Sequence, residues 1–327
     1  MLKPSEDTLG REIDTALQNI AIPERPKSLY DPVRYTLRLG GKRIRPRLVL
    51  IGCGLAGGST QAALPAAMAV ELLHNFTLVH DDIMDEATSR RGQPAVHTRW
   101  DESTAILSGD VMFNLAYEQL QAYAEHDAGM FARLHHIFSE ATRIVCEGQA
   151  LDMDFENSLS VSVEDYIHMI ECKTAALLRA SLQMGAVVSG ADKPFIDQLG
   201  SLGNAAGTAF QIQDDLLDAI GDPKAFGKRA GGDIYEGKKT YLSILALERA
   251  EGAQHDRIAG ILQKPDASAG EVEHVIDAYH QLGVIDDTRA AIEARYHSCH
   301  EVLEVLPEST YKKALTQLIE MLKQRRH

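Results

Sequence analysis

The chain has 327 residues, 45% of them hydrophobic, and carries a formal net charge of −14. This acidic balance argues against binding of nucleic acid through a general basic surface, so any bound anion must meet a local basic cluster. The polar start of the chain lacks the apolar run of a signal peptide, and no later apolar stretch reaches the roughly 18 to 20 residues that span a bilayer, which predicts a protein that is neither exported nor membrane-spanning. Four cysteines lie far apart, without zinc or disulfide-scaffold spacing, and predict reduced, buried thiols in a cytoplasmic protein: Cys53, Cys146, Cys172 and Cys299.

Segments rich in Ala, Leu, Glu, Gln and Arg follow one another along the chain and predict an all-α fold. Length alone would allow two domains, but no proline occurs between Pro94 and Pro194 and no linker interrupts the pattern, so we predict one helical domain over residues 1–327. Breaks between helices are expected at "LGGKRIRP" (39–46), "AGGST" (56–60), "RRGQP" (90–94), "SGADKP" (189–194), "GDPKAFGKRAGGDIYEGK" (221–238) and "QKPDAS" (263–268).

The first acidic motif ends a predicted helix over residues 64–85, "LPAAMAVELLHNFTLVHDDIMD", whose Pro65 suits a first helical turn. At 3.6 residues per turn, Asp81 and Asp85 lie on one face, and His74 falls on nearly the same stripe. Taken alone, such a charge run is more often a solvated helix end than a binding site.

A second copy of the motif changes that interpretation. "FQIQDDLLD" (210–218) repeats the spacing inside another apolar helical pattern, with Gln211 on the same face as its aspartates. Two ionised clusters that face a common core require cations, and oxygen ligands alone favour Mg²⁺ over zinc or copper. Calcium is disfavoured because no calcium-loop pattern of ligands around a glycine occurs.

Basic residues gather near both motifs. "GGKRIRPRL" (40–48) precedes the first acidic helix, Arg90 and Arg91 follow it, and "ECKTAALLRA" (171–180) and the Gly-rich segment supply further lysines. Arginine forks and lysine charges suit phosphate oxygens, so we expect a phosphate-bearing substrate, over which the Gly-rich loop could close.

Seven motifs in order, "GGKRIRP", "HNFTLVHDDIMDEATSRRGQPAVH", "LSGD", "GQALD", "KT" (173–174), "QIQDDLLD" and "GKKT", resemble those of trans-type (E) isoprenyl diphosphate synthases over about residues 30 to 245. The resemblance implies an isoprenoid-synthase helical bundle around a central active-site cavity, forming a homodimer. It implies head-to-tail condensation of isopentenyl diphosphate with an allylic diphosphate, release of pyrophosphate, and three Mg²⁺ ions assembled with the allylic diphosphate.

The resemblance also implies residue roles. The metal ligands would be Asp81, Asp85, Asp214, Asp215 and Asp218. The allylic substrate would be held by Arg90, Lys173, Thr174, Gln211, Lys228 and Lys238, with the choice between Lys238 and Lys239 left open. Isopentenyl diphosphate would be held by Lys42, Arg45, His74 and Arg91. The catalytic residues would be Asp81, Asp85, Asp214, Lys173 and Arg90. Phe76, five positions before Asp81, would be the floor of the hydrocarbon pocket, which predicts a C20 product, with C15 as the alternative and very long chains disfavoured.

Two other classes use related motifs. A terpene cyclase would place Asn, Ser or Thr with Glu in the second acidic site, and a non-catalytic subunit of a heteromeric synthase would commonly lack one cluster, whereas both clusters are intact here. Residues beyond about 250 predict amphipathic helices, "VIDD" (284–287) is interpreted as a helix start, and the terminal "KQRRH" (323–327) as a solvated basic end.

Overall fold

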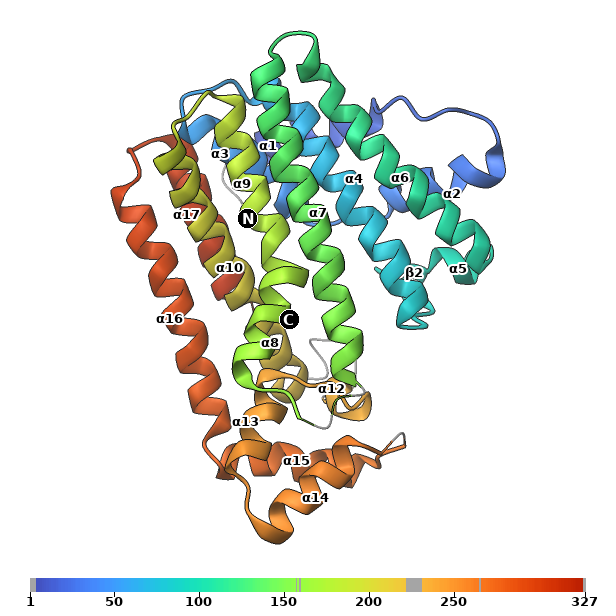
Figure 1. The fold of residues 1–327 in the computed structure, drawn as a ribbon, viewed down its shortest axis with the longest axis vertical. Coiled ribbons are helices and arrows are strands. Elements are labelled where there is room, and N and C mark those ends of the chain that lie inside the picture. Colours follow the sequence, from blue (N-terminus) through green and yellow to red (C-terminus); the bar gives the residue numbers. More distant parts are fainter. Residues whose placement is uncertain (1–3, 157, 159, 222–230, 265, 326–327) are drawn as a thin grey trace. The chain divides into compact units, whose positions relative to one another are not determined.

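The computed structural model describes residues 4–156, 158, 160–221, 231–264 and 266–325, and its ribbon is built almost entirely of helices (Figure 1). The predicted all-α class is therefore confirmed. The helices are α1 (Pro4–Gln18), α2 (Lys27–Arg38), α3 (Ile44–Leu55), α4 (Thr60–Met84), α5 (Val96–Arg99), α6 (Glu102–Ala124), α7 (Ala128–Glu156), α8 (Val163–Ile170), the π-helix η1 (Glu171–Ala175), α9 (Ala176–Val188), α10 (Lys193–Ile220), α12 (Gly232–Tyr235), α13 (Tyr241–Arg249), α14 (Gly252–Leu262), α15 (Ala269–Gln281), α16 (Val284–Val305) and α17 (Thr310–Lys323). The strands β1 (Ser89–Arg90) and β2 (Gln93–Pro94) form an antiparallel hairpin.

The chain forms two compact units. Unit 1 comprises residues 1–142, 180–200 and 307–315, and unit 2 comprises residues 143–179, 201–306 and 316–327. Four of the five boundaries between them fall inside helices α7, α9, α10 and α17, and the fifth, after residue 306, falls between α16 and α17. The prediction of a single domain remains a prediction.

Helix α4 forms the core of unit 1, where it packs against α3 and α6 (Figure 1). It begins at Thr60, four residues before the predicted start, so Pro65 lies inside the helix. Proline has a helical φ and costs one backbone hydrogen bond there, which a long packed helix tolerates. Among the described helices, α4 is long and apolar enough to cross a bilayer by length and composition, which corrects the expectation that no apolar stretch reaches about 18 to 20 residues. In the structure, 61% of its most apolar window is buried, as in a core helix.

Glycines allow α3 to approach α9 closely within unit 1. A Cβ atom at Gly52 would lie 2.5 Å from the carbonyl oxygen of Leu182, and a Cβ atom at Gly185 would lie 2.1 Å from that of Val49. Both distances are far below a normal carbon–oxygen contact, so any larger residue would force these two backbones apart. The helix that carries the GGKRIRP motif is thus fixed by backbone-to-backbone packing.

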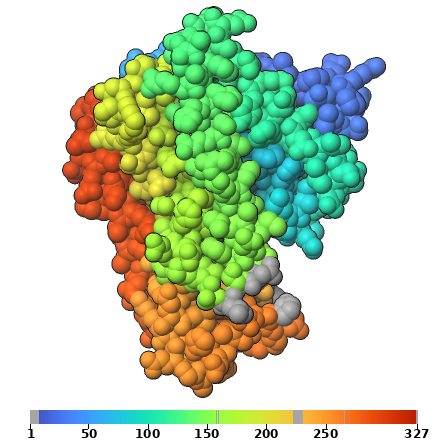
Figure 2. Space-filling view, viewed as in Figure 1, coloured from blue at the N-terminus to red at the C-terminus, as the bar shows by residue number. Residues whose placement is uncertain are grey.

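Unit 2 packs helix α13 against α8 and α16, and α14 against α15. The space-filling view shows α14 and α15 as one continuous orange surface (Figure 2). Residues 284–287 start α16 as predicted, although Gly283 is the N-cap and Asp286 and Asp287 belong to the first turn. Three of the four cysteines are buried and none is in a disulfide, but Cys146 is exposed, contrary to the prediction for this thiol.

Candidate active site

The first acidic motif lies at the C-terminal end of α4 in unit 1. Asp81 is half-buried, and Asp85 is exposed and caps the helix end. Between them, Asp82 is buried and accepts hydrogen bonds from the Nε and Nη2 atoms of Arg90, with Nε at 2.9 Å. Burial by itself would lower the pKa of Arg90, but the hydrogen bond and charge of Asp82, with Asp81 and Asp85, raise it. Arg90 is therefore permanently charged, and Asp82 holds its guanidinium beside Asp81 and Asp85. The sequence motifs gave no role to Asp82.

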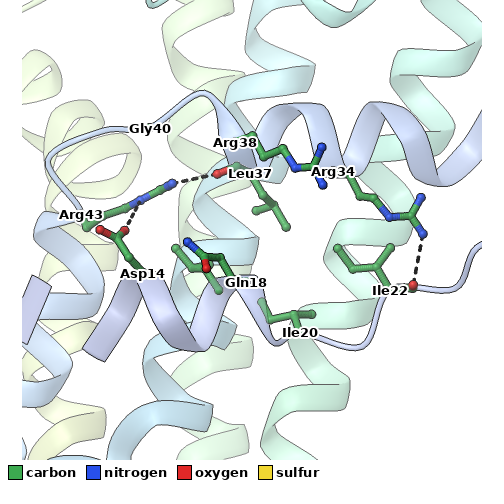
Figure 3. Close-up of a pocket in the computed structure, with 10 residues that line it drawn as sticks. Asp14, Gln18, Ile20, Ile22, Arg34, Leu37, Arg38, Gly40 and Arg43 are labelled. Carbon is green, nitrogen blue, oxygen red and sulfur yellow. Dashed lines mark hydrogen bonds and ion pairs between the residues drawn. The ribbon is translucent and has the colours of Figure 1, made fainter. Parts of the chain in front are cut away.

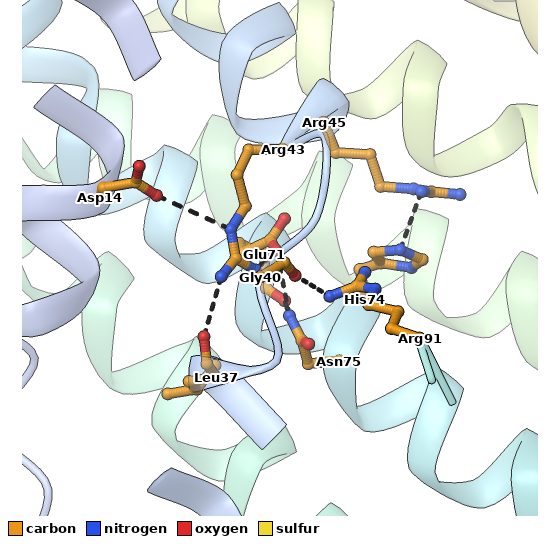
Figure 4. Close-up of polar contacts among 9 residues, drawn as sticks. All are labelled: Asp14, Leu37, Gly40, Arg43, Arg45, Glu71, His74, Asn75 and Arg91. Carbon is orange, nitrogen blue, oxygen red and sulfur yellow. Dashed lines mark hydrogen bonds and ion pairs between the residues drawn. The ribbon is translucent and has the colours of Figure 1, made fainter. Parts of the chain in front are cut away.

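The four residues predicted to hold isopentenyl diphosphate all belong to unit 1, and Figure 4 shows three of them, Arg45, His74 and Arg91, near the loop that precedes α3. The Nη1 atom of Arg45 lies 3.1 Å from the Nε2 atom of His74. Burial and the neighbouring arginines keep the pKa of His74 well below its ordinary value, so His74 is neutral at pH 7 and its Nε2 accepts this hydrogen bond. Burial also lowers the pKa of Arg45, to about 10, which leaves it charged. Arg91 donates from its Nη1 atom to the carbonyl oxygen of Gly40, so the β1–β2 hairpin is joined to the same loop, on which Lys42 is exposed.

A cavity in unit 1 does not coincide with these residues. It measures about 630 Å³ and opens between α1, α2 and the loop before α3 (Figure 3). Its lining consists of Asp14, Leu17, Gln18, Ile20, Ile22, Arg34, Leu37, Arg38, Gly40 and Arg43. No predicted substrate residue is among them. The cavity therefore lies beside the loop that precedes α3, and it is not lined by the residues predicted to hold isopentenyl diphosphate.

The second acidic motif lies on α10 in unit 2, and each of its three aspartates has a protein donor. Asp214 accepts a hydrogen bond from Arg325. Asp218 accepts one from the backbone N–H of Asp233 at 2.8 Å. The expectation that the C-terminal basic residues are solvated is therefore wrong for Arg325, whose guanidinium pairs with a predicted metal ligand and lies 5.1 Å from the ring centre of Phe210.

Asp215 is buried and belongs to a chain of hydrogen bonds. It accepts from the hydroxyl of Tyr166 at 2.5 Å and from the Nε2 atom of Gln211 at 3.1 Å, and the Oε1 atom of Gln211 accepts from Thr174 at 2.9 Å. Two residues predicted to hold the allylic substrate, Gln211 and Thr174, are thus aligned by a carboxylate that faces protein donors. The sequence did not reveal Tyr166, which lies 49 residues from its partner.

Lys173 lies in the π-helix η1, which interrupts one long helical run between α8 and α9. Its ammonium group donates to Asp152 at 2.5 Å, and Asp152 is the last residue of the GQALD motif. The glycine of that motif has a separate task, because a Cβ atom at Gly148 would lie 2.2 Å from the backbone nitrogen of Lys173. The GQALD motif therefore has two tasks: Gly148 lets α7 pack closely against the backbone of Lys173, and Asp152 is the counter-ion of its ammonium group.

The remaining predicted lysines lie in or near the Gly-rich segment. Lys228 lies outside the described residues. Lys238 forms an ion pair of 2.7 Å with Glu236, and Lys239 is half-buried beside it. The choice between Lys238 and Lys239 as the substrate contact stays open.

Phe76 packs into a row of aromatic side chains within unit 1. Its ring centre lies 4.8 Å from that of His80 and 5.4 Å from that of Phe113 on α6. Phe113 in turn lies 5.2 Å from Tyr117, one turn further along α6. Sequence reasoning missed Phe113 because its partner lies on another helix, although the i, i+4 pair of aromatic residues on α6 was a visible signal.

The carboxylates of the two acidic motifs fit a metal ion whose coordination is completed by oxygen atoms of the substrate. Among the described residues, no group of three or more His, Cys, Asp or Glu side chains forms a closed metal cage. Each acidic motif instead offers carboxylates on one helix, beside cationic groups that suit a phosphate. Mg²⁺ is typically held in this way, by one or two carboxylates together with water and substrate phosphates.

The buried position of Asp215 predicts a pH-dependent stability. Burial and the charge of Asp214 raise the pKa of Asp215 above its ordinary 3.8 in the folded state, so the folded protein binds an extra proton and loses stability as the pH rises from about 4 to the raised pKa. An Asp215→Asn variant does not titrate, and we expect its melting temperature in metal-free buffer at pH 8 to exceed that of the parent by about 2 °C or more. Thermal melts at pH 4 are the control, because the difference should vanish there; an equal difference at both pH values would contradict the prediction.

Comparisons with known proteins agree on one family. A family model described as polyprenyl synthetase matches residues 26–279. The chain is 39% identical over 302 residues to a short chain isoprenyl diphosphate synthase of Methanothermobacter thermautotrophicus, with 92% of each chain covered. It is 35% identical to a geranylfarnesyl diphosphate synthase of Natronomonas pharaonis, with 96% and 95% covered. A crystal structure of geranylgeranyl pyrophosphate synthetase from Pyrococcus horikoshii superposes with a TM-score of 0.92 at 37% identity, over 98% of this chain and 97% of that one.

Proposed function

Since this chain belongs to the polyprenyl synthetase family, we propose that it is a prenyltransferase that joins isopentenyl diphosphate head-to-tail to an allylic diphosphate, releases pyrophosphate and makes mainly the C20 product. The enzyme class follows from the family, and the product length is the finer part of the proposal. Relatives of similar identity are named for geranylgeranyl and for geranylfarnesyl products, so C25 is the neighbouring alternative.

The observation that supports the proposal is that unit 1 contains two differently built groups of polar side chains, each of which would suit an anion. One is the carboxylate pair Asp81 and Asp85 beside Arg90, which suits a metal-bound diphosphate. The other is the basic group around Arg45 and the neutral His74, which suits a diphosphate without metal. A reaction between two diphosphates needs both kinds, because only the diphosphate that leaves develops extra charge. A terpene cyclase, which has one diphosphate substrate, needs only the first.

In the proposed reaction, the C–O bond of the allylic diphosphate breaks, the double bond of isopentenyl diphosphate attacks the allylic carbon, and a proton passes to the departing diphosphate. The carboxylates on α4 and α10 would hold Mg²⁺, which supplies charge stabilisation to that diphosphate when bound. Arg90 in unit 1 is fixed by Asp82, and Lys173 in unit 2 is fixed by Asp152, so each would offer a fixed positive charge to a diphosphate bound beside it. Arg45 and His74 orient isopentenyl diphosphate, so that the attack becomes an encounter of two aligned groups.

The direct test uses purified protein, Mg²⁺, isopentenyl diphosphate and, in turn, dimethylallyl, geranyl and farnesyl diphosphate. We expect pyrophosphate release that requires both substrates, and C20 as the main dephosphorylated product on chromatography. Pyrophosphate release from an allylic diphosphate alone would identify a cyclase. No release with any starter would identify a non-catalytic subunit, and either result would overturn the proposal.

Replacement of Phe76 by alanine is expected to lengthen the product. The change opens space where Phe76 now contacts Phe113, so a chain that stops at C20 should extend by one or more isoprene units while the first condensation is retained. Phe113→Ala should shift products in the same direction, and Phe195→Ala at the start of α10 is the matched control that should not. An unchanged product distribution in Phe76→Ala would remove this residue as the floor of the pocket.

A further inference from the structure

The family motifs give no role to Arg43, the last residue of the loop formed by residues 40–43, which we call the GGKR loop. Its side chain is only 7% exposed and forms an ion pair of 2.5 Å with Glu71 on α4, whose own side chain is 2% exposed. Its Nη2 atom donates to the carbonyl oxygen of Leu37 in the last turn of α2, at 2.8 Å. Its Nε atom lies 3.9 Å from Asp14 on α1 (Figure 4). One guanidinium therefore connects the loop to three helices.

The backbone of the GGKR loop depends on these contacts. Gly40, Gly41 and Arg43 all have positive φ angles, of 75°, 136° and 49°. The two glycines adopt such angles freely, but Arg43 does so against the steric preference of its Cβ atom. A side-chain-bearing residue keeps this conformation only where its surroundings hold it, and at Arg43 these surroundings are the hydrogen bonds of the guanidinium.

On the side that faces α1 and α2, the GGKR loop is not held by apolar packing in addition to the polar contacts of Arg43. There Gly40 and Arg43 line the cavity of about 630 Å³ (Figure 3). A loop backed by an open space of this size can shift unless polar contacts fix it. The Arg43–Glu71 pair is the shortest of the contacts that Arg43 makes.

The other side of the loop carries the predicted substrate contacts. Lys42 precedes Arg43 directly, Arg45 follows it by two positions, and Glu71 lies three residues before His74 on α4. We propose that the buried Arg43–Glu71 ion pair is a positioning device, which fixes the GGKR loop to α4 so that Lys42 and Arg45 meet the diphosphate of isopentenyl diphosphate in one geometry. This inference rests on the proposed function.

The charge of Glu71 supports a positioning role. A carboxylate near a diphosphate site repels the substrate, so Glu71 weakens binding by its charge alone. Its Oε1 atom also accepts from the Nδ2 atom of Asn75 at 3.1 Å, which orients the acceptor toward Arg43. The buried carboxylate of Glu71 therefore does not serve to bind the diphosphate. Its role is explained if it holds Arg43, which in turn fixes the GGKR loop.

The test compares the Michaelis constants for the two substrates in four changes of this pair. Arg43→Lys keeps the charge but cannot reach Glu71 and Leu37 together, because an ammonium lacks the guanidinium fork. Glu71→Leu removes the acceptor, whereas Glu71→Gln retains an amide oxygen for it. The double variant Arg43→Met with Glu71→Leu removes both charges, which should recover much of the thermal stability that a single removal costs.

We expect Arg43→Lys and Glu71→Leu to raise KM for isopentenyl diphosphate about tenfold or more, while KM for the allylic substrate stays within about twofold. Glu71→Gln should return KM to within about threefold of the parent. The double variant should melt near the parent temperature and still show the raised KM, which a merely structural role would not produce. Unchanged or equally raised constants in folded Arg43→Lys, or a normal KM in the double variant, would overturn the inference.

Lys42→Met separates this inference from the proposed function. It removes a predicted substrate contact and leaves the ion pair intact, so it should raise KM for isopentenyl diphosphate. If it does and Arg43→Lys does not, only the positioning inference fails. If Lys42→Met has no effect on that constant, the proposed isopentenyl site fails together with the inference.

Discussion

Replacement of Asp81 by alanine is expected to lower turnover at least about a hundredfold while the protein stays folded, because we propose that Asp81 acts on the leaving diphosphate. Asp214→Ala should have a comparable effect, although it also removes the carboxylate of the Asp214–Arg325 ion pair. Steady-state turnover at saturating Mg²⁺ measures the loss, and circular dichroism checks the helical content. Either variant with near-normal turnover would show that its cluster does not serve the leaving group.

Asp286→Ala is the matched control for both variants. Asp286 belongs to the "VIDD" sequence that resembles the acidic motifs, but it lies in the first turn of α16, and its side chain is 86% exposed. The pair that it forms with Arg289 at 3.3 Å is a surface ion pair, which contributes little stability. We expect turnover of this variant within about twofold of the parent, since surface substitutions are usually near neutral.

Gly148→Ala is expected to lower the stability of the protein, because α7 and η1 pack backbone against backbone at this glycine. The added methyl group would lie 2.2 Å from the nitrogen and 2.6 Å from the Cα atom of Lys173, and backbone atoms cannot rotate away as a side chain can. The helices must separate, which should lower the free energy of unfolding by about 1–3 kcal/mol. The same shift should raise KM for the allylic substrate, because Lys173 moves away from Asp152.

Denaturant unfolding and steady-state kinetics measure these two effects. Gly260→Ala is the control, since Gly260 lies in α14, and a Cβ atom there meets nothing within 4 Å. Alanine has the higher helix propensity, so this variant should gain up to about 1 kcal/mol. If Gly148→Ala were as stable as the parent, the close packing of α7 on η1 would not be needed.

The sequence predicted those features that depend on short spacing. Helical periodicity gave the all-α class, and the repeated acidic pattern located α4 and α10, because residues four positions apart share a helix face whatever the tertiary fold. Asp81 and Asp85 therefore lie near one another in the structure as predicted. Their roles as ligands, the dimer and the cytoplasmic location stay predictions.

The features that the sequence did not predict all depend on partners distant in the chain or on backbone conformation. Arg325 pairs with Asp214 across 111 positions, and Tyr166 pairs with Asp215 across 49. No spacing rule connects such residues before the helices are packed. The positive φ of Arg43 was equally invisible, because a left-handed conformation at a non-glycine residue has no composition signal.

The π-helix at Glu171–Ala175 has a consequence for how this family can accumulate insertions and deletions. A π-turn holds one residue more than an α-turn, so loss of one residue there would restore a regular α-helix and change the helix face on which the residues of that turn lie. Lys173 and Thr174 would then leave the faces on which they meet Asp152 and Gln211. Family members that keep these contacts should therefore keep the length of residues 163–188 fixed, and a single-residue gap inside that segment of an alignment would mark a lineage that has lost the proposed allylic contacts.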